Sequence, residues 1–273
     1  MSDILKDLSA PALVAAIKAN LFEWWRYLGS SPKAELYDSP ELTWLLTGIP
    51  HPFVNSVLRT QAEPDNVDAI IEKTLAHFRS RDVTKFSWWT EPGTQPTDLG
   101  KHLMDHGLTY TDGGPGMAVD LLGLNEDLPT PTGLTIEHVE DTEALRKWAY
   151  ASIIGFELPE TSVNTWFDLF TNLGFDLPLR NYLGILNGEP VAASELFLGA
   201  GVAGIYVAAT IPEARRQGIG AAITLAPLRD ARAMGFRIGI LHSSQMGLGV
   251  YRRLGFQEYC KMSCYGKWAS DIS

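Results

Sequence analysis

The most constraining feature of this chain is the run from Gly204 to Gly220, with the sequence GIYVAATIPEARRQGIG. Small and β-branched residues from Ile205 to Thr210 predict a strand. Pro212 then predicts a turn, and the glycine-containing segment after it opens an amphipathic helix that extends to about Met234.

The start of this helix is a predicted anion-binding site. The first backbone N–H groups of a helix have no partner within it, and the aligned peptide dipoles place partial positive charge there. Because glycine has no Cβ, a pyrophosphate can come close to the backbone at two positions, and two arginines add charge. The residues expected to bind it are Arg215, Arg216, Gln217, Gly218, Ile219, Gly220 and Ala221. The run matches neither the dinucleotide fingerprint nor a Walker loop, and an ordinary joint with glycines for packing is the alternative.

A second motif follows at the spacing of a further strand and helix. An apolar strand is predicted from Phe236 to Leu241, and after it comes Ser244-x-x-Gly247-x-x-Val250-Tyr251-Arg252-Arg253-Leu254-Gly255-Phe256. The first motif, Arg215-x-x-Gly218-x-Gly220, resembles the acyl-CoA pyrophosphate motif of the GCN5-related N-acetyltransferases. The second resembles the following helix and Leu-Gly-Phe turn of the same family. The resemblance covers about residues 134 to 267, roughly half of the chain.

The resemblance implies an α/β fold with a mixed sheet, in the order β-α-α-β-β-β-α-β-α-β, and acetyl-CoA as co-substrate. Sequence patterns from Leu134 onward give the same order. In the family fold, the strands Ile205–Thr210 and Phe236–Leu241 would splay apart to admit the pantetheine arm. The residues whose backbone would pair with that arm are Val207, Ala208, Ala209 and Thr210, and Ser244 and Gly247 are also expected beside the cofactor.

The N-terminal half contains a weaker copy of the same pattern. A shift of 150 positions aligns identical residues without a gap: Thr60, Glu63, Thr74, Leu75, Ala76 and Arg79 fall on Thr210, Glu213, Thr224, Leu225, Ala226 and Arg229. In this register the first arginine and first glycine of the CoA motif are replaced by Asp65 and Asp68, which would repel a pyrophosphate.

This repeat sets the expected domain organisation. We expect two tandem copies of the fold: a degenerate copy at residues 1–125 without the CoA motif, a linker at 126–133, and an active copy at 134–273. Pro129 and Pro131 mark the linker. An unrelated α+β domain is the alternative for the N-terminal half.

Acetyl transfer from a thioester to an amine needs a neutral amine, a stabilised oxyanion and a proton for the leaving thiolate. The resemblance implies Tyr251 as the general acid, since a phenol of normal pKa about 10 is protonated at neutral pH. Backbone N–H groups near Val207 to Ala209 are the expected oxyanion donors. Some relatives place a glutamate base at the position of Gly204; here Glu195, on the neighbouring strand, and His242 are the candidates. Binding of an already neutral amine is the alternative to a base.

The charge distribution fits an anionic co-substrate. The chain carries a net charge of −10, yet residues 210–273 hold nine Lys or Arg and four Asp or Glu. A basic end on an acidic protein suits acetyl-CoA and not nucleic acid, which needs a wider basic face. The expected acceptor is a primary amine on a small molecule or a peptide, and a homodimer is left open.

Other classes are disfavoured. Cys260 and Cys264 lie four apart in one predicted strand and lack a metal-ligand spacing, so we predict no metal. Charged residues at the start of the chain are unlike a signal peptide, and no apolar stretch approaches the roughly 20 residues of a membrane span. We expect a cytoplasmic enzyme without a membrane partner. A non-catalytic acyl-CoA-binding regulatory module and transfer to a hydroxyl or thiol acceptor are the alternatives.

Overall fold

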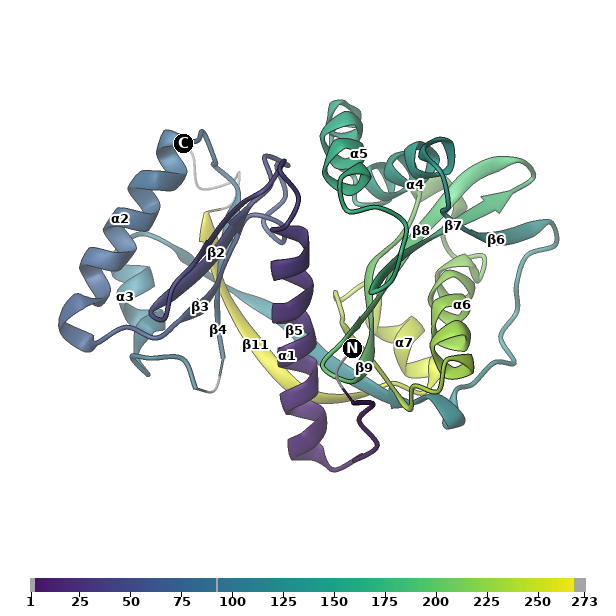
Figure 1. Cartoon of the computed structure of the whole chain (residues 1–273), viewed down its shortest axis with the longest axis horizontal. Helices are drawn as coiled ribbons and strands as arrows, with labels where there is room; N and C mark the ends of the chain where they lie inside the picture. Colours follow the sequence, from purple (N-terminus) through teal and green to yellow (C-terminus); the bar gives the residue numbers. More distant parts are fainter. Residues whose placement is uncertain (1–2, 92, 268–273) are drawn as a thin grey trace. The chain divides into compact units, whose positions relative to one another are not determined.

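The computed structural model describes residues 3–91 and 93–267 (Figure 1), so the outermost residues of the expected domains, 1–2 and 268–273, lie outside the described part. The chain forms two compact units. The larger unit joins the residues up to Tyr27 to Pro115–Cys260, and the smaller unit joins Leu28–Gly114 to the residues from Lys261 onward. These boundaries differ from the expected division at residue 125, because each unit combines segments that are far apart in the sequence.

The elements after residue 134 follow the predicted order. They are β6 (Leu134–His138), α4 (Thr142–Gly155), α5 (Val163–Thr171), β7 (Leu179–Leu186), β8 (Glu189–Gly199), β9 (Val202–Thr210), α6 (Ile219–Ala233), β10 (Ile238–His242), α7 (Leu248–Leu254) and β11 (Gln257–Lys267). Local signals set several ends. The Asp141 side chain accepts the Ala144 N–H at 2.8 Å at the start of α4, and Asn187 and Gly188 adopt φ values of 52° and 90° between β7 and β8.

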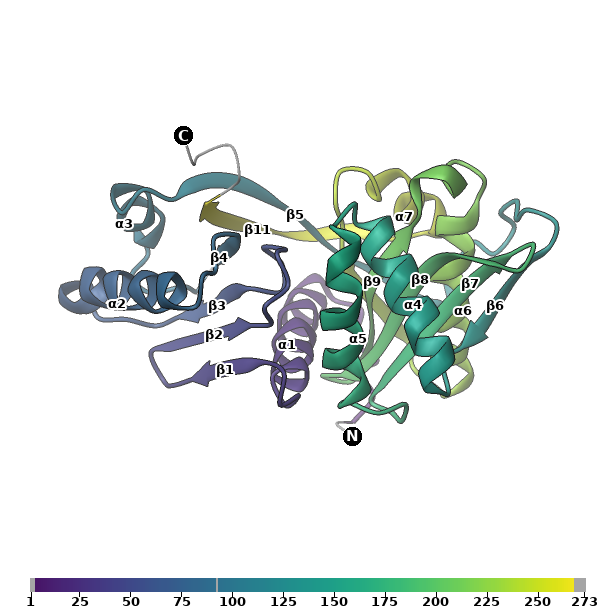
Figure 2. The same ribbon diagram turned by 90° about the horizontal axis from the view of Figure 1, so that it is seen from above.

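The larger unit is built on a mixed sheet in the order β5-β10-β9-β8-β7-β6, where β5 is Thr109–Asp120 and β9 and β10 are the parallel pair. On one face α4 and α5 lie side by side (Figure 2), and Gly155 of α4 packs on Ala209. On the other face α6 packs against β8, where the Ser194 hydroxyl donates to the Ile223 carbonyl at 2.7 Å. The first helix, α1 (Ala10–Leu28), also packs against this sheet, since Asn20 Nδ2 donates to the Gly199 carbonyl at 2.8 Å.

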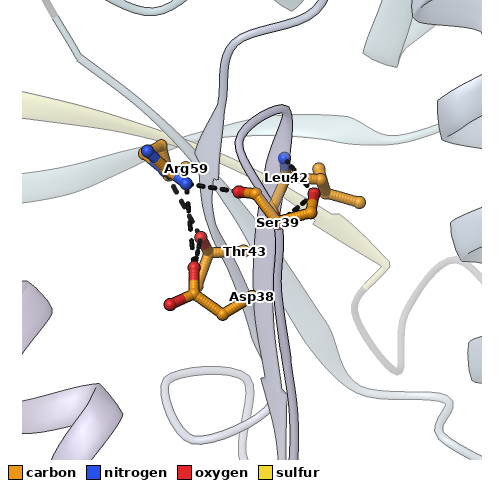
Figure 3. A network of polar contacts seen from close by, with 5 residues as sticks. All are labelled: Asp38, Ser39, Leu42, Thr43 and Arg59. Carbon is orange, nitrogen blue, oxygen red and sulfur yellow. Dashed lines mark hydrogen bonds and ion pairs between the residues drawn. The ribbon is translucent and has the colours of Figure 1, made fainter.

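The strands of the smaller unit follow the order β1-β2-β3-β4-β11 in the sheet. The other elements of this unit are β1 (Glu35–Asp38), β2 (Leu42–Leu46), β3 (Ser56–Thr60), α2 (Val67–Ser80), β4 (Phe86–Thr90) and α3 (Leu99–Asp105). Figure 3 shows the polar network that ties β1 and β2 to β3: the Thr43 hydroxyl donates to Asp38 Oδ1 at 2.8 Å, and Arg59 donates to the Ser39 carbonyl and to Thr43 Oγ1. The short β1 strand was not predicted from the sequence.

The repeat predicted at a shift of 150 is present in the backbone. β3 ends at Thr60 and β9 ends at Thr210, and each strand is followed by a helix and then by a parallel neighbour, β4 or β10. Each strand also carries one extra residue shortly before its end, where its ladder with β2 or β8 shifts register. Such a β-bulge at the same place in both strands supports two copies of one fold.

The last strand of each copy pairs within the other unit. β5 follows α3 in the chain, yet its residues from Gly116 to Asp120 pair with β10. β11 follows α7, yet its residues from Ser263 to Lys267 pair with β4. A fragment cut at the predicted linker would therefore lose one strand of its sheet, so binding is best tested on the whole chain.

Candidate functional site

β9 and β10 pair over only part of their length. Their ladder ends at Ile205 and Leu241, and beyond this point β9 continues to Thr210 with β8 as its partner on the other edge. In the described part of the chain, the β10 side of Val207–Thr210 therefore faces no neighbouring strand. This is the expected splay, and such an edge offers backbone N–H and C=O groups to an extended ligand.

A β-bulge distorts β9 at this position. Val207 has a φ of 51°, in the left-handed region that β-branched residues rarely adopt, and the ladder with β8 skips Ser194 here. The Ser194 carbonyl instead accepts the Trp148 indole N–H of α4 at 3.1 Å. The bulge places backbone groups of Val207 and Ala208 outside the β8 ladder, in a strained conformation that the packing of α4 maintains.

The start of α6 presents consecutive backbone N–H groups. Among the described residues, the N–H groups from Arg216 to Gly220 donate no hydrogen bond, whereas those of Ala221 and Ala222 both reach the Gly218 carbonyl at 3.1 Å. Arg216 and Gly218 have φ values of 63° and 88°. Adjacent donors in such a turn, at the positive end of a helix, form an anion-binding concavity.

The two glycines of this turn have different roles. A Cβ on Gly218 would lie 2.1 Å from the Pro129 carbonyl oxygen, so this glycine is required by its φ and by packing against the segment predicted as a linker. A Cβ on Gly220 would meet only Thr210 Oγ1, at 3.8 Å. Packing thus explains Gly218 but not Gly220, which leaves open space above the donors.

Arg215 is held by protein groups. Its guanidinium donates to the carbonyls of Thr210 and Gly155 at 3.1 and 2.9 Å, and to Glu157 Oε1 at 2.6 Å. These contacts tie the turn to the end of α4, where a cation is favoured by the helix dipole. The structure gives Arg215 a positioning role, and a direct contact with a pyrophosphate stays a prediction. Arg216 and Gln217 are exposed beside the turn.

The basic excess of the C-terminal segment is largely paired with acids from other segments. Arg229 and Arg232 bind Glu126 at 2.7 and 2.6 Å, and Arg237 binds Asp120 at 2.5 Å. These arginines fix the chain before β6 and the end of β5. The charge count alone therefore overstated the positive field that a co-substrate would meet, and the N–H groups at the start of α6 supply more of the attraction for an anion.

Tyr251 lies on α7 against Gly247. A Cβ on Gly247 would be 2.7 Å from the Tyr251 ring, and the ring also packs edge-on against Phe256 at 6.0 Å. Ser244 caps this turn, because its Oγ accepts the Gly247 N–H at 3.2 Å. In the described part of the chain the Tyr251 hydroxyl has no hydrogen bond, and burial raises its pKa to about 12. The phenol is therefore protonated at neutral pH and has a proton to donate.

Both candidate bases are buried. Glu195 is fully buried, its Oε1 accepts the indole N–H of Trp24 on α1, and burial raises its pKa to about 8. Burial lowers the pKa of His242 to about 4, so this imidazole is a weak base at neutral pH. Packing also explains why position 204 holds glycine and not the glutamate expected from some relatives: a Cβ on Gly204 would lie 2.1 Å from Asn20 Oδ1.

The N-terminal copy lacks this site for two reasons. The segment after β4 bridges to the end of β3: the Gln95 N–H donates to the Thr60 carbonyl at 3.2 Å, and the Ala62 N–H donates to the Gln95 carbonyl at 3.1 Å. The segment around Gln95 thus occupies the edge of β3 that corresponds to the open edge of β9. Asp68 places a carboxylate in the first turn of α2, where a pyrophosphate would need positive charge, and His102 and His106 contact that carboxylate at 2.9 and 3.0 Å.

The described residues also limit other classes of site. No group of three or more His, Cys, Asp or Glu side chains within them is arranged to hold a metal ion. No helix in these ranges is both long and apolar enough to cross a membrane.

Comparisons with known proteins agree with this geometry. No protein-family model and no curated protein matches the sequence. Among solved structures, a GCN5-related N-acetyltransferase from Kribbella flavida is 20% identical, with 98% of each chain covered and a TM-score of 0.64. A GCN5-related N-acetyltransferase from Sphaerobacter thermophilus is 15% identical, with 97% of this chain and 94% of that chain covered and a TM-score of 0.58. A tandem protein of this fold from the clavulanic acid biosynthesis pathway is 14% identical, with coverages of 90% and 94% and a TM-score of 0.55. The chain therefore has the fold of the GCN5-related N-acetyltransferases, in two tandem copies.

Proposed function

We propose that the protein transfers an acetyl group from acetyl-CoA to a primary amine, at one site in the C-terminal copy and in the cytoplasm. The observation that carries this proposal is the combination of an open β9 edge with unpaired N–H groups at the start of α6. An extended pantetheine arm fits the edge, and a pyrophosphate fits the donors of Gln217 to Gly220. In the N-terminal copy, the corresponding edge of β3 is occupied by the segment around Gln95, and the start of α2 carries the negative charge of Asp68.

Three groups of the C-terminal copy would carry the chemistry. In its ionised form, Glu195 takes a proton from the acceptor ammonium, and the neutral nitrogen forms a C–N bond with the thioester carbonyl carbon. Backbone N–H groups near Val207 to Ala209 stabilise the oxyanion. As the C–S bond breaks, Tyr251 donates its proton to the sulfur, and the phenolate recovers a proton from the nitrogen of the new amide. Glu195 finally releases its proton to solvent.

Gly220→Asp should weaken acetyl-CoA binding at least about tenfold. The substitution places a side chain and a negative charge over the N–H groups, and charged hydrogen bonds contribute about 1.5–3 kcal/mol each. Calorimetric titration of the folded variant checks this. Gly123→Asp is the matched control, because an added Cβ on Gly123 meets no atom within 4 Å, and one on Gly220 meets only Thr210 Oγ1, at 3.8 Å. An unchanged affinity in Gly220→Asp would mean that no pyrophosphate binds at this turn.

The activity itself is tested on the purified protein. We expect mass spectrometry to find a co-purified acyl-CoA, and a panel of primary amines to include one that releases CoA thiol from acetyl-CoA. Binding without release for any amine would favour the regulatory module. Release that requires a hydroxyl or thiol compound would instead indicate a different acceptor class.

A further inference from the structure

Two buried oxygen atoms of the larger unit accept no hydrogen bond within the described part of the chain. They are Glu195 Oε2 and Asn181 Oδ1, and their residues are 0% and 3% exposed. Buried polar atoms in native proteins nearly always have a partner. These two acceptors are therefore available to a ligand that brings N–H groups.

The two side chains lie next to each other. Asn181 on β7 is the direct partner of Glu195 in the antiparallel ladder with β8. Side chains of directly opposed residues share a face, with Cβ atoms about 4.5–5.5 Å apart. On the other edge of β8, Glu195 is paired with Tyr206, the residue before Val207. The two acceptors thus lie near the β-bulge whose backbone is proposed to hold the acetyl carbonyl.

We propose that Glu195 and Asn181 bind the amino group of the acceptor and that Trp24 is a positioning residue for Glu195. This inference rests on the proposed acetyltransferase function. A primary ammonium has three N–H donors, enough for both oxygens. The Trp24 indole occupies Oε1, which leaves Oε2 for the amine. Because both acceptors are buried, the acceptor class is a primary amine at the end of a slender, unbranched chain.

A network on α1 holds Trp24 in place. Its ring stacks on Tyr206 with centroids 4.4 Å apart and planes within 5°, and the Tyr206 hydroxyl donates to Asn20 Oδ1 at 2.7 Å. Asn20 in turn donates to the Gly199 carbonyl. The first helix of the chain therefore fixes the orientation of a carboxyl group on β8, and neither Trp24 nor Asn20 belongs to the C-terminal copy.

The electrostatics favour delivery of a neutral amine. Tyr27 on α1 and Tyr206 on β9 are ionisable groups that interact with the charge of Glu195, and burial raises the pKa of both tyrosines, so both are neutral at neutral pH. An ammonium that enters beside Glu195 forms an ion pair in a desolvated environment. Transfer of a proton from nitrogen to Oε2 replaces this pair with a neutral amine and a neutral carboxyl group, which burial favours.

The indole N–H of Trp24 gives a direct readout. The chain has eight tryptophans, and Trp24→Phe identifies the Trp24 signal in an indole ¹⁵N spectrum while keeping a ring on Tyr206. Butylammonium is the probe, and 1-butanol is the control with the same chain but no ammonium. We expect a saturable shift of the Trp24 signal with butylammonium alone, in the free protein or in the presence of CoA. The shift should be absent in Glu195→Gln and require at least tenfold more probe in Asn181→Leu, with Asn172→Leu as the matched control.

The outcomes separate this inference from the proposed function. No shift with butylammonium, with or without CoA, would overturn the amine site, as would an equal shift in Glu195→Gln. If Glu195→Gln does not fold, unchanged affinity in Asn181→Leu would overturn the amine site in its place. An amine-dependent shift in a protein that never binds acetyl-CoA would instead refute the acetyltransferase function and keep the amine site.

The positioning role of Trp24 has its own test. Trp24→Phe should move the midpoint of the pH–rate profile upward, because the N–H that the variant loses stabilises the charged carboxylate of Glu195. An unmoved midpoint would refute that role.

Discussion

Replacing Tyr251 with Phe should lower turnover by about 10² or more while leaving the affinity for acetyl-CoA nearly unchanged. The factor is the usual contribution of a positioned general acid. The variant keeps the ring, which packs against Gly247 and Phe256, and removes a hydroxyl that has no hydrogen bond among the described residues. Thiol release measures the rate, and calorimetry measures the affinity.

A matched control is Tyr150→Phe, which removes an exposed hydroxyl from α4 and should change neither quantity. Since the pKa of Tyr251 is about 12, the acid stays protonated below that pH and should not limit the rate at neutral pH. Turnover of Tyr251→Phe equal to that of the unaltered protein would show that Tyr251 is a packing residue and that solvent protonates the thiolate.

Introducing the glutamate found in some relatives, by Gly204→Glu, should destabilise the fold by about 3 kcal/mol or more. A Cβ at this position would lie 2.1 Å from Asn20 Oδ1 and 2.6 Å from the Tyr206 ring. Overpacking costs about 1–3 kcal/mol, and a buried carboxylate without a partner adds to that cost. Thermal unfolding should show a midpoint lower by roughly 6 °C or more.

Gly123→Ala provides the control for this substitution, because an added Cβ there meets no atom within 4 Å, and its midpoint should stay within about 1 °C. Unchanged stability in Gly204→Glu would contradict the packing of α1 on β9. It would also remove the physical reason for the absence of the glutamate from this strand.

The order of strands and helices could be predicted because its signals are local. Asp141 caps α4, Asn187-Gly188 joins β7 to β8, and Gly218 is the N-cap residue of α6. Strand β1 was missed, since four residues at a sheet edge with two half-buried positions give little alternation to detect. The exchange of β5 and β11 was also missed, because sequence patterns predict a strand but not which neighbour it pairs with.

Parts of the site depend on contacts between distant residues. Arg215 was expected beside the pyrophosphate, but the carbonyls and the carboxylate that bind it belong to segments that no local pattern connects to it. Trp24 was not predicted as a site residue, and only the fold shows its contact with Glu195. Glu195 was proposed from its place on the strand next to β9, whereas Asn181 was not predicted, because its pairing with Glu195 is set by the register between β7 and β8.

Calorimetric titration of the whole chain with acetyl-CoA tests the central claim most directly, namely one acyl-CoA site per chain, located at the start of α6. We expect one equivalent bound, the same stoichiometry in Asp65→Arg, and strongly weakened binding in Gly220→Asp. Two equivalents per chain, or an affinity that Gly220→Asp leaves unchanged, would contradict this claim.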